Sequence, residues 1–222
     1  MTKTMKLAGA FLALTVTGSA FAQSTTTSST LASPDLGAGV LGHRYADAGF
    51  QYTDVNHTPF DVWGLTGVIN NPVTKNIDVS LDYTYSWVKG WSANHDNSVN
   101  VNGIYYLDYG AFKPFAAVSL GYEWTRYSYT QYSEESAYNV QSNDDRATWG
   151  GRVGVEYQVT PQVSVTAQVE YDSDFKRGNN NDSWDGDVTG RYWFTKQIAA
   201  YATVAWLEYG DWGYGAGVTY KF

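Results

Sequence analysis

The stretch that most constrains how this chain can fold is its last eleven residues, 212–222, which alternate between two kinds of side chain. Large or apolar residues hold every second position from Trp212 to Phe222, while Gly, Thr and Lys fill the positions between them. Successive side chains of a β-strand point to opposite faces, so this period predicts a strand with one apolar face and one small or polar face. On the small face, Gly213, Gly215 and Gly217 are expected to leave open space beside the first strand.

The same alternation recurs from about residue 43 onward and is interrupted by turn residues. The clearest case is residues 76–88, where Ile77, Val79 and Leu81 share one face and Asp78, Ser80 and Asp82 share the other. Short alternating runs separated by turn signals are typical of an all-β barrel or sandwich. We predict ten strands: 43–54, 60–70, 76–88, 99–109, 116–124, 149–158, 163–171, 184–194, 197–209 and 211–222.

The connections between these runs alternate between short and long. The tight connections are 70–75, 110–114, 160–161 and 195–196, and the longer ones are 55–59, 89–96, 127–145 and 173–183, with a short exception at Gly210. Short turns at one end and longer loops at the other, with an even strand number, are typical of transmembrane barrels. The fold class predicted is therefore all-β, an antiparallel up-and-down transmembrane β-barrel of about ten strands, with eight strands as the runner-up.

The N-terminal region has a different character. Lys3 and Lys6 precede an apolar run, and Ala20-Phe21-Ala22 has the form of a cleavage site, so residues 1–22 are predicted to be a secretory signal peptide. Residues 23–37 are rich in Ser and Thr with little to bury, which indicates a flexible leader. Residues 38–222 are assigned to the barrel.

Composition and tryptophan placement fit a surface that meets lipid. Charged residues make up 16% of the chain and aromatic residues 17%, whereas soluble domains carry about 25% charged residues. Aromatic side chains concentrate at both interfaces of a membrane. We predict an aromatic girdle at the outer strand ends: Trp63, Trp87, Trp124, Trp149, Trp184, Trp206 and Trp212.

The signal peptide, the alternating strands and the ending Tyr220-Lys221-Phe222 together resemble small bacterial outer-membrane β-barrel proteins. The resemblance to the opacity/OmpA-like porin superfamily is architectural and assigns no subfamily, since familiar members of that group have eight strands. It implies residence in the bacterial outer membrane, with membrane lipid and lipopolysaccharide as surroundings. It also implies that Tyr220 and Phe222 form the signal read by the barrel-assembly machinery.

The inward positions of the predicted strands carry many acids and few bases. The acids are Asp47, Asp78, Asp82, Asp108, Glu123, Glu156, Glu170, Asp185 and Asp187, and the bases are Arg152, Arg191 and Lys221. Unpaired charges in a dry interior are costly, so the imbalance favours a hydrated lumen or acids at the rims. Two hypotheses follow, a small acid-lined pore and a closed structural surface protein.

Arg152 is predicted to be the centre of a charged lumen cluster, approached by Glu123 and Glu170 from the two neighbouring strands. The candidate site residues of the lumen are Arg152, Glu123, Glu170, Asp82, Glu156 and Arg191.

Two other function classes are weighed against these hypotheses. The segment 127–145 combines tyrosines with small polar residues, which suits adhesion or binding of an extracellular ligand. An outer-membrane protease or lipid-modifying enzyme is less favoured, because the pairs Asp54/His57 and His95/Asp96 lack a protease-like spacing. We therefore predict no enzymatic activity, no cofactor and no metal site. The net charge of −8 and the lack of a basic patch argue against nucleic-acid binding.

Overall fold

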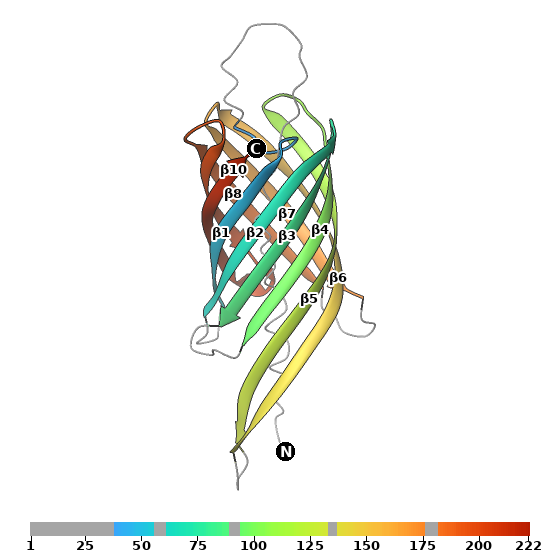
Figure 1. The fold of residues 1–222 in the computed structure, drawn as a ribbon, viewed down its shortest axis with the longest axis vertical. Helices are drawn as coiled ribbons and strands as arrows, with labels where there is room; N and C mark the ends of the chain where they lie inside the picture. The colour runs from blue at the N-terminus through green and yellow to red at the C-terminus, as the bar shows by residue number, and fades with distance from the viewer. Residues whose placement is uncertain (1–37, 56–60, 89–93, 133–136, 176–181) are drawn as a thin grey trace, which may run out of the picture.

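The computed structural model describes residues 38–55, 61–88, 94–132, 137–175 and 182–222. The predicted signal peptide and leader, residues 1–37, lie outside the described residues, as does His57. Figure 1 shows the described part as one barrel whose strands are tilted relative to its long axis. The strands are β1 (Tyr45–Asp54), β2 (Asp61–Thr74), β3 (Ile77–Val88), β4 (His95–Tyr106), β5 (Phe112–Tyr132), β6 (Ala137–Thr160), β7 (Val163–Asp174), β8 (Ser183–Trp193), β9 (Ile198–Trp206) and β10 (Trp212–Lys221).

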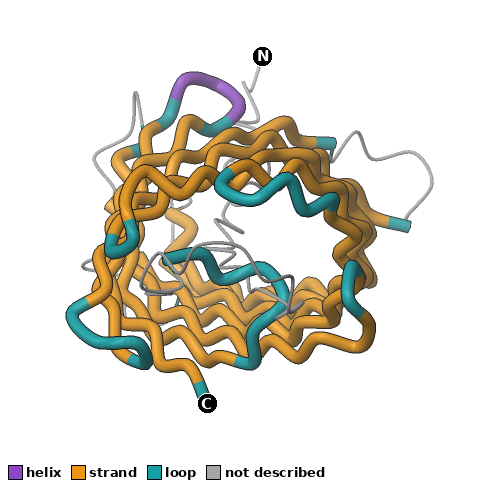
Figure 2. Tube along the Cα trace, turned by 90° about the horizontal axis from the view of Figure 1, so that it is seen from above, coloured by secondary structure: helices purple, strands orange, loops and turns teal. Residues whose placement is uncertain are grey.

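The sheet closes on itself. Each strand pairs with its sequence neighbours, and β1 pairs with β10 in antiparallel register from Tyr45↔Lys221 to Asp54↔Trp212. Figure 2 shows the resulting ring from above. The predicted ten-stranded antiparallel barrel is confirmed, and the eight-stranded runner-up is wrong, because each of the ten alternating runs forms its own strand.

The two ends of the barrel differ, and we call them the turn end and the loop end. β1 begins and β10 finishes at the turn end, where β2–β3, β4–β5, β6–β7 and β8–β9 are joined by at most five residues. The loop end carries the other connections, including a 3-10 helix, η2 (Glu208–Gly210), which makes the short β9–β10 link. A φ of 82° at Gly210 suits glycine at this tight link.

β5 and β6 run well past the rest of the barrel at the loop end (Figure 1). The neighbouring ladders stop at His95↔Arg126 and Thr148↔Asp174, while β5 and β6 stay paired to Tyr132↔Ala137. The connection predicted at 127–145 is therefore, in its described residues, a paired extension of β5 and β6. The sequence of this stretch is rich in polar residues and lacks the clear alternation from which the other strands were predicted.

The distribution of side chains is inverted relative to a soluble protein. On β3, Leu81 is 47% exposed on the outside, while Asp82 beside it is 1% exposed on the inside. Most large apolar and aromatic side chains of the strands face outward, and most of the buried inward side chains are polar or charged. An outward apolar band is the feature that lets a closed barrel sit in lipid. No helix in the described part of the chain has the length and apolar character needed to cross a membrane.

Candidate functional site

The interior of the barrel is the candidate site, because it gathers the buried charged side chains. Among the described residues these are seven acids (Asp47, Asp78, Asp82, Glu123, Glu156, Glu170 and Asp185) and five bases (Lys113, Arg146, Arg152, Arg191 and Lys221). All six predicted lumen residues, Arg152, Glu123, Glu170, Asp82, Glu156 and Arg191, are buried there.

The charge imbalance is smaller than the sequence indicated. Lys113 and Arg146 are inward because β5 and β6 start earlier and end later than predicted, which adds two bases to the interior. Asp108 was predicted to face inward, and this is wrong: β4 ends at Tyr106, so Asp108 is exposed in the following turn.

The turn end of the lumen holds a segment of the chain that the sequence analysis did not identify. We call residues 38–43 the inner segment; they precede β1 and lie inside the ring of strands, with Ala38, Val40 and Leu41 fully buried. The segment turns at Val40–His43, where the His43 N–H donates to the Val40 carbonyl over 3.4 Å. Gly42 takes a φ of 85° in this turn, as position i+2 of a type II turn requires.

Two carboxylates of the barrel wall accept hydrogen bonds from the backbone of the inner segment. The Val40 N–H donates to Glu156 Oε2 over 2.7 Å, and the Leu41 N–H makes a longer contact of 3.4 Å with Oε1. The Gly42 N–H donates to Asp78 Oδ2 over 3.0 Å. Hydrogen bonds to ionised acceptors are stronger than neutral ones, so Glu156 and Asp78 anchor consecutive peptide groups.

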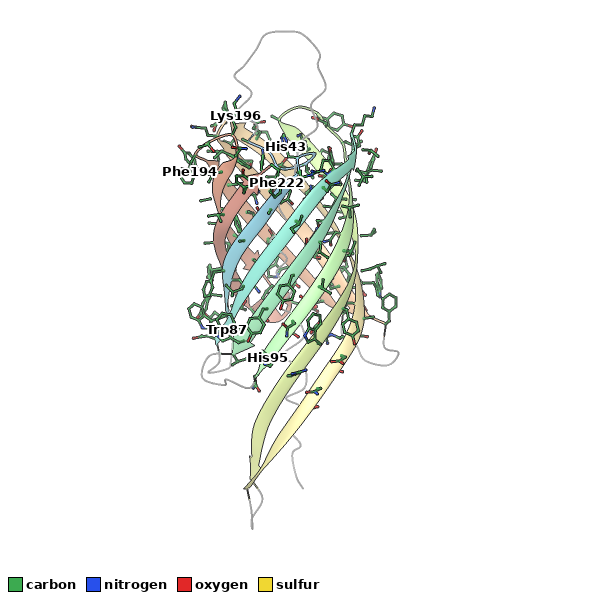
Figure 3. All side chains as sticks on the ribbon, in the orientation of Figure 1. His43, Trp87, His95, Phe194, Lys196 and Phe222 are labelled. Atoms are coloured by element: carbon green, nitrogen blue, oxygen red, sulfur yellow. The ribbon has the colours of Figure 1, made fainter. Side chains whose placement is uncertain are left out.

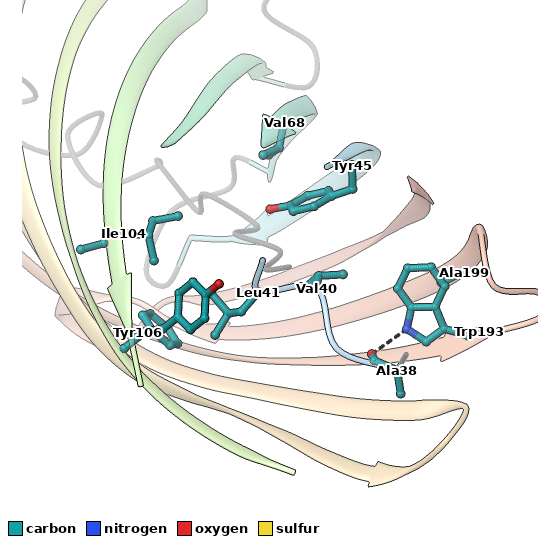
Figure 4. Packing of buried hydrophobic residues seen from close by; sticks show 11 residues of the cluster. Ala38, Val40, Leu41, Tyr45, Val68, Ile104, Tyr106, Trp193 and Ala199 are labelled. Carbon is teal, nitrogen blue, oxygen red and sulfur yellow. Dashed lines mark hydrogen bonds between the residues drawn. The ribbon is translucent and has the colours of Figure 1, made fainter. Parts of the chain in front are cut away.

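Side chains from β8 and β10 hold the carbonyl groups of the same segment. Trp193 Nε1 donates to the Ala38 carbonyl over 2.7 Å, as Figure 4 shows. Lys221 Nζ donates to the Gly39 carbonyl and lies 3.8 Å from the centroid of the Trp193 ring. Residues 38–42 of the inner segment are thus held through their backbone by residues of four strands, β3, β6, β8 and β10.

An apolar cluster packs around the inner segment. The buried side chains of this cluster are Ala38, Val40, Leu41, Tyr45, Val68, Ile104, Tyr106, Phe115, Ala117, Trp193 and Ala199, and Figure 4 shows most of them around residues 38–41. Burying one Val or Leu side chain stabilises by about 1.5–3 kcal/mol. The turn end of the lumen is therefore filled by apolar packing as well as by polar contacts.

His43 ends the inner segment and carries no charge at neutral pH. Its burial, together with the ammonium groups of Lys221 and Lys113, lowers the pKa of His43 to about 3. Its carbonyl accepts a hydrogen bond from Asn70 Nδ2 over 3.1 Å, and Asn70 also donates to Asp78. A neutral imidazole adds no further positive charge beside the two lysines.

An ion pair joins β8 to β1 across the inner wall. Arg191 Nη2 lies 3.1 Å from Asp47 Oδ2, and Arg191 Nε donates to Thr219 Oγ1 over 2.9 Å. Arg191 also lies over the Tyr201 ring, 5.4 Å from its centroid. A buried guanidinium that contacts several strands holds these strands in one register relative to each other.

The predicted cluster around Arg152 forms only in part. Arg152 Nη1 lies 3.9 Å from Glu170 Oε1, as expected from β7. Glu123, predicted to approach Arg152 from β5, instead makes an ion pair with Arg146. The reason is the register of β5 and β6, which pairs Glu123 with Arg146 and Arg152 with Ala117.

Asp82, the remaining predicted lumen residue, belongs to a separate network. Its two carboxylate oxygens accept hydrogen bonds from Ser80 Oγ over 2.9 Å and from Asn102 Nδ2 over 2.8 Å. The lumen is thus divided into small networks whose acids each have nearby donors.

The space predicted beside the glycines of β10 is occupied at Gly217. Gly217, its register partner Gly49 and Tyr201 lie in one row across three strands. The Tyr201 ring covers both glycines, because a Cβ on either one would collide with its hydroxyl end. The expectation that these glycines leave open space is wrong at Gly217, where a side chain of β9 fills it.

The tryptophans of the predicted girdle lie on the outside of the barrel. Trp149, Trp184, Trp206 and Trp212 are exposed, Trp63, Trp87 and Trp124 are partly exposed, and Figure 3 shows Trp87 near the loop end. At the turn end, Phe194 and Phe222 face outward in the same figure. Tyr220 and Phe222, the predicted assembly signal, make an edge-on pair with centroids 5.3 Å apart.

The residues proposed for catalysis do not form a pair on one face. His95 faces outward, near the Tyr85 ring, with 6.0 Å between ring centroids, whereas Asp96 faces inward and accepts a hydrogen bond from Thr125 Oγ1 over 2.6 Å. Within the described ranges, no group of three or more His, Cys, Asp or Glu side chains is arranged to hold a metal ion. The absence of enzymatic activity and of a cofactor stays a prediction.

The comparisons with known proteins find similar folds but no family. No family model matches the sequence, and no curated protein matches it. The chain is structurally similar to small bacterial outer-membrane β-barrels. The β-barrel domain of Pseudomonas aeruginosa OprF is 14% identical, with 82% of this chain and 99% of that one covered and a TM-score of 0.42.

Two further solved structures are a porin and a surface protein. The NanC porin is 13% identical, with 80% of this chain and 100% of that one covered and a TM-score of 0.46. Neisserial surface protein A is 18% identical, with 81% and 96% covered and a TM-score of 0.42. At these values the similarity concerns the fold alone, so the function is argued below from the residues.

Proposed function

We propose that this chain is a non-enzymatic structural surface protein of the outer membrane, whose barrel is closed in its resting state. The observation that carries the proposal is the inner segment, which fills the turn end of the lumen. In outer-membrane barrels the short turns face the periplasm, so the closed end is the periplasmic one. Of the two hypotheses from the sequence, the closed scaffold is therefore favoured over an open acid-lined pore.

The polar networks farther from the turn end support the same proposal. Arg191 with Asp47, Arg152 with Glu170 and Arg146 with Glu123 each join two or more strands across the inner wall. Paired charges of this kind hold strand register, which suits a structural barrel.

Purified protein refolded into a planar bilayer is expected to carry no steady current. The reason is that Val40, Leu41 and Trp193 close the lumen at the turn end. Single-channel recording checks this, with heat-modifiable migration in detergent gels as the control that the recorded protein is folded. Regular current steps from untreated, folded protein would contradict the proposed closed state.

A second candidate function is partner binding by the β5–β6 ribbon. Beyond the neighbouring ladders, residues 127–132 of β5 and 137–142 of β6 pair only with each other, so each has one backbone edge without a neighbouring strand in the described structure. An exposed strand edge can accept an extended segment of another protein. This observation favours an extracellular ligand at the ribbon.

Shortening the ribbon tests this second function. Replacing residues 130–139 with Asn-Gly keeps Tyr129↔Val140 as the last pair and gives a favoured two-residue turn. For any ligand that the full protein binds in a panel of immobilised extracellular proteins, adherence of cells displaying the shortened protein is expected to fall to background, while heat-modifiable migration stays unchanged. Full adherence by the shortened protein would exclude the ribbon as the binding surface for this ligand.

A further inference from the structure

We propose that the inner segment is a releasable latch, and that its release converts the closed barrel into a cation-selective pore. The inference rests on the proposed closed resting state and adds an activity to it. Four features of the structure carry it: the independence of the barrel wall from the inner segment, the kind of contact that holds the segment, a glycine near its β1 end, and the charge of the lumen behind it.

The barrel wall is complete without the inner segment. β1 keeps ten register pairs with β2 and ten with β10, and all of them lie in Tyr45–Asp54, after the segment ends. The ladders around the rest of the ring close without it as well. Withdrawal of residues 38–43 therefore breaks no strand pair.

The contacts that hold the segment are replaceable by water. Its backbone donates to the carboxylates of Glu156 and Asp78 and accepts from Lys221 and Trp193. After release, these charged groups line a water-filled mouth and become hydrated, so much of each hydrogen bond is recovered. The apolar contacts of Val40 and Leu41 oppose release and keep the latch closed at rest.

A glycine near the start of β1 can serve as a hinge for the inner segment. Gly42, with its φ of 85°, lies near the β1 end of the inner segment, directly after the anchored residues 38–41, and glycine can change this backbone angle at low steric cost. The segment can therefore rotate about Gly42 while Tyr45 and the following strand remain in place.

The lumen behind the latch is lined by charges with an excess of acids. Seven buried acids face five buried bases among the described residues, and Glu156 and Asp78 would be added to the free acids of the mouth once the backbone leaves them. A narrow passage lined by an excess of negative charge favours cations.

The experiment uses a thiol reporter on the latch. The chain has no cysteine, so Val40→Cys places a single thiol on a side chain that is fully buried in the closed state. Glu156→Gln removes the anchoring charge, and Leu41→Asp places a carboxylate in the apolar cluster. Glu123→Gln is the matched control, because it also removes a buried carboxylate but one that is paired with Arg146 away from the latch.

Labelling and current are measured on the same refolded proteins. With a membrane-impermeant maleimide, Glu156→Gln and Leu41→Asp are expected to raise the labelling rate of the reporter on the order of tenfold or more, since a lost charge-assisted hydrogen bond shifts an opening equilibrium by about that factor. Both variants are expected to conduct, with a reversal potential in a KCl gradient that shows preference for K⁺ over Cl⁻. The Glu123→Gln protein is expected to stay unlabelled and closed.

The outcomes separate the two proposals. Current from the unmodified protein overturns the closed resting state and the latch together. A closed unmodified protein whose two variants are labelled but silent overturns the latch alone, and so does anion preference in the variants. Unchanged labelling in both variants also overturns it, because the segment is then not releasable.

Discussion

Replacing Arg191 with methionine is expected to lower the free energy of unfolding of the barrel by about 3–5 kcal/mol, the range for removing one partner of a buried ion pair. The side chains of Arg191 and Asp47 are 2% and 1% exposed, so the Asp47 carboxylate would be left with little water to replace the guanidinium. Thr219 would lose its hydrogen bond to Arg191 Nε as well. Urea unfolding in lipid vesicles, followed by tryptophan fluorescence, measures the change.

Two further variants decide whether the loss comes from the unpaired charge. The double variant Asp47→Asn with Arg191→Met buries no charge, so its loss is expected to be clearly smaller than that of Arg191→Met alone. Arg44→Met is the matched surface control: Arg44 is exposed, bonded to Asn71 Oδ1, and its replacement should change stability by at most about 0.5 kcal/mol. Equal losses in the single and double variants would show that packing, and not the ion pair, is responsible.

The architecture could be predicted because each strand carries its own signal. A run such as Ile77–Trp87 alternates between lipid and lumen at every residue, and this period of two does not depend on what the neighbouring strands do. The number of strands follows from counting these alternating runs. An even number of antiparallel strands lets β1 pair with β10 and close the barrel. The same signal fails for 127–145, whose sequence does not keep one regular alternation between apolar and polar residues along the whole stretch.

The inner segment could not be predicted because its contacts are all distant in sequence. Val40 meets Glu156, and Ala38 meets Trp193, over separations of 116 and 155 residues. The segment itself is short, with Val40 and Leu41 between glycines, and it has neither a strand nor a helix period. One residue of the barrel could have indicated the inner segment. Trp193 is a large aromatic residue at an inward position of β8, and a purely polar lumen would not need one there.

The pairing of lumen charges depends on the register between strands, which alternation does not give. The sequence correctly placed Glu123, Arg152 and Glu170 on inward faces, but a strand can slide by two residues without changing which face a residue occupies. The observed register sets Glu123 beside Arg146 and not beside Arg152. Arg146 lies between the predicted connection 127–145 and the predicted strand 149–158 and was assigned to neither, so its role as partner could not be seen.

Replacing Gly217 with valine is expected to destabilise the barrel by about 1–3 kcal/mol or more, the usual cost of adding atoms to a filled site. A Cβ at this position would collide with the Ala48 carbonyl oxygen of β1 and with the Tyr201 ring that covers the row. The carbonyl belongs to the ladder that closes the barrel, so it cannot move without disturbing the β1–β10 pairs. The fraction of protein that migrates as the compact form in unheated detergent gels, measured against urea concentration, reports the loss.

Gly190→Val is the matched control for this substitution. Gly190 is also a strand glycine, on β8, but a Cβ there meets nothing within 4 Å. Its replacement should leave stability unchanged or slightly improved, because a β-branched residue suits a strand better than glycine does. If both variants lose stability equally, glycine at 217 is needed for backbone reasons shared by the two strands. If only Gly217→Val loses stability, the close approach of Tyr201 and Ala48 is the cause. The barrel then closes at this row because the Tyr201 ring packs against two residues, Gly217 and Gly49, that have no side chain.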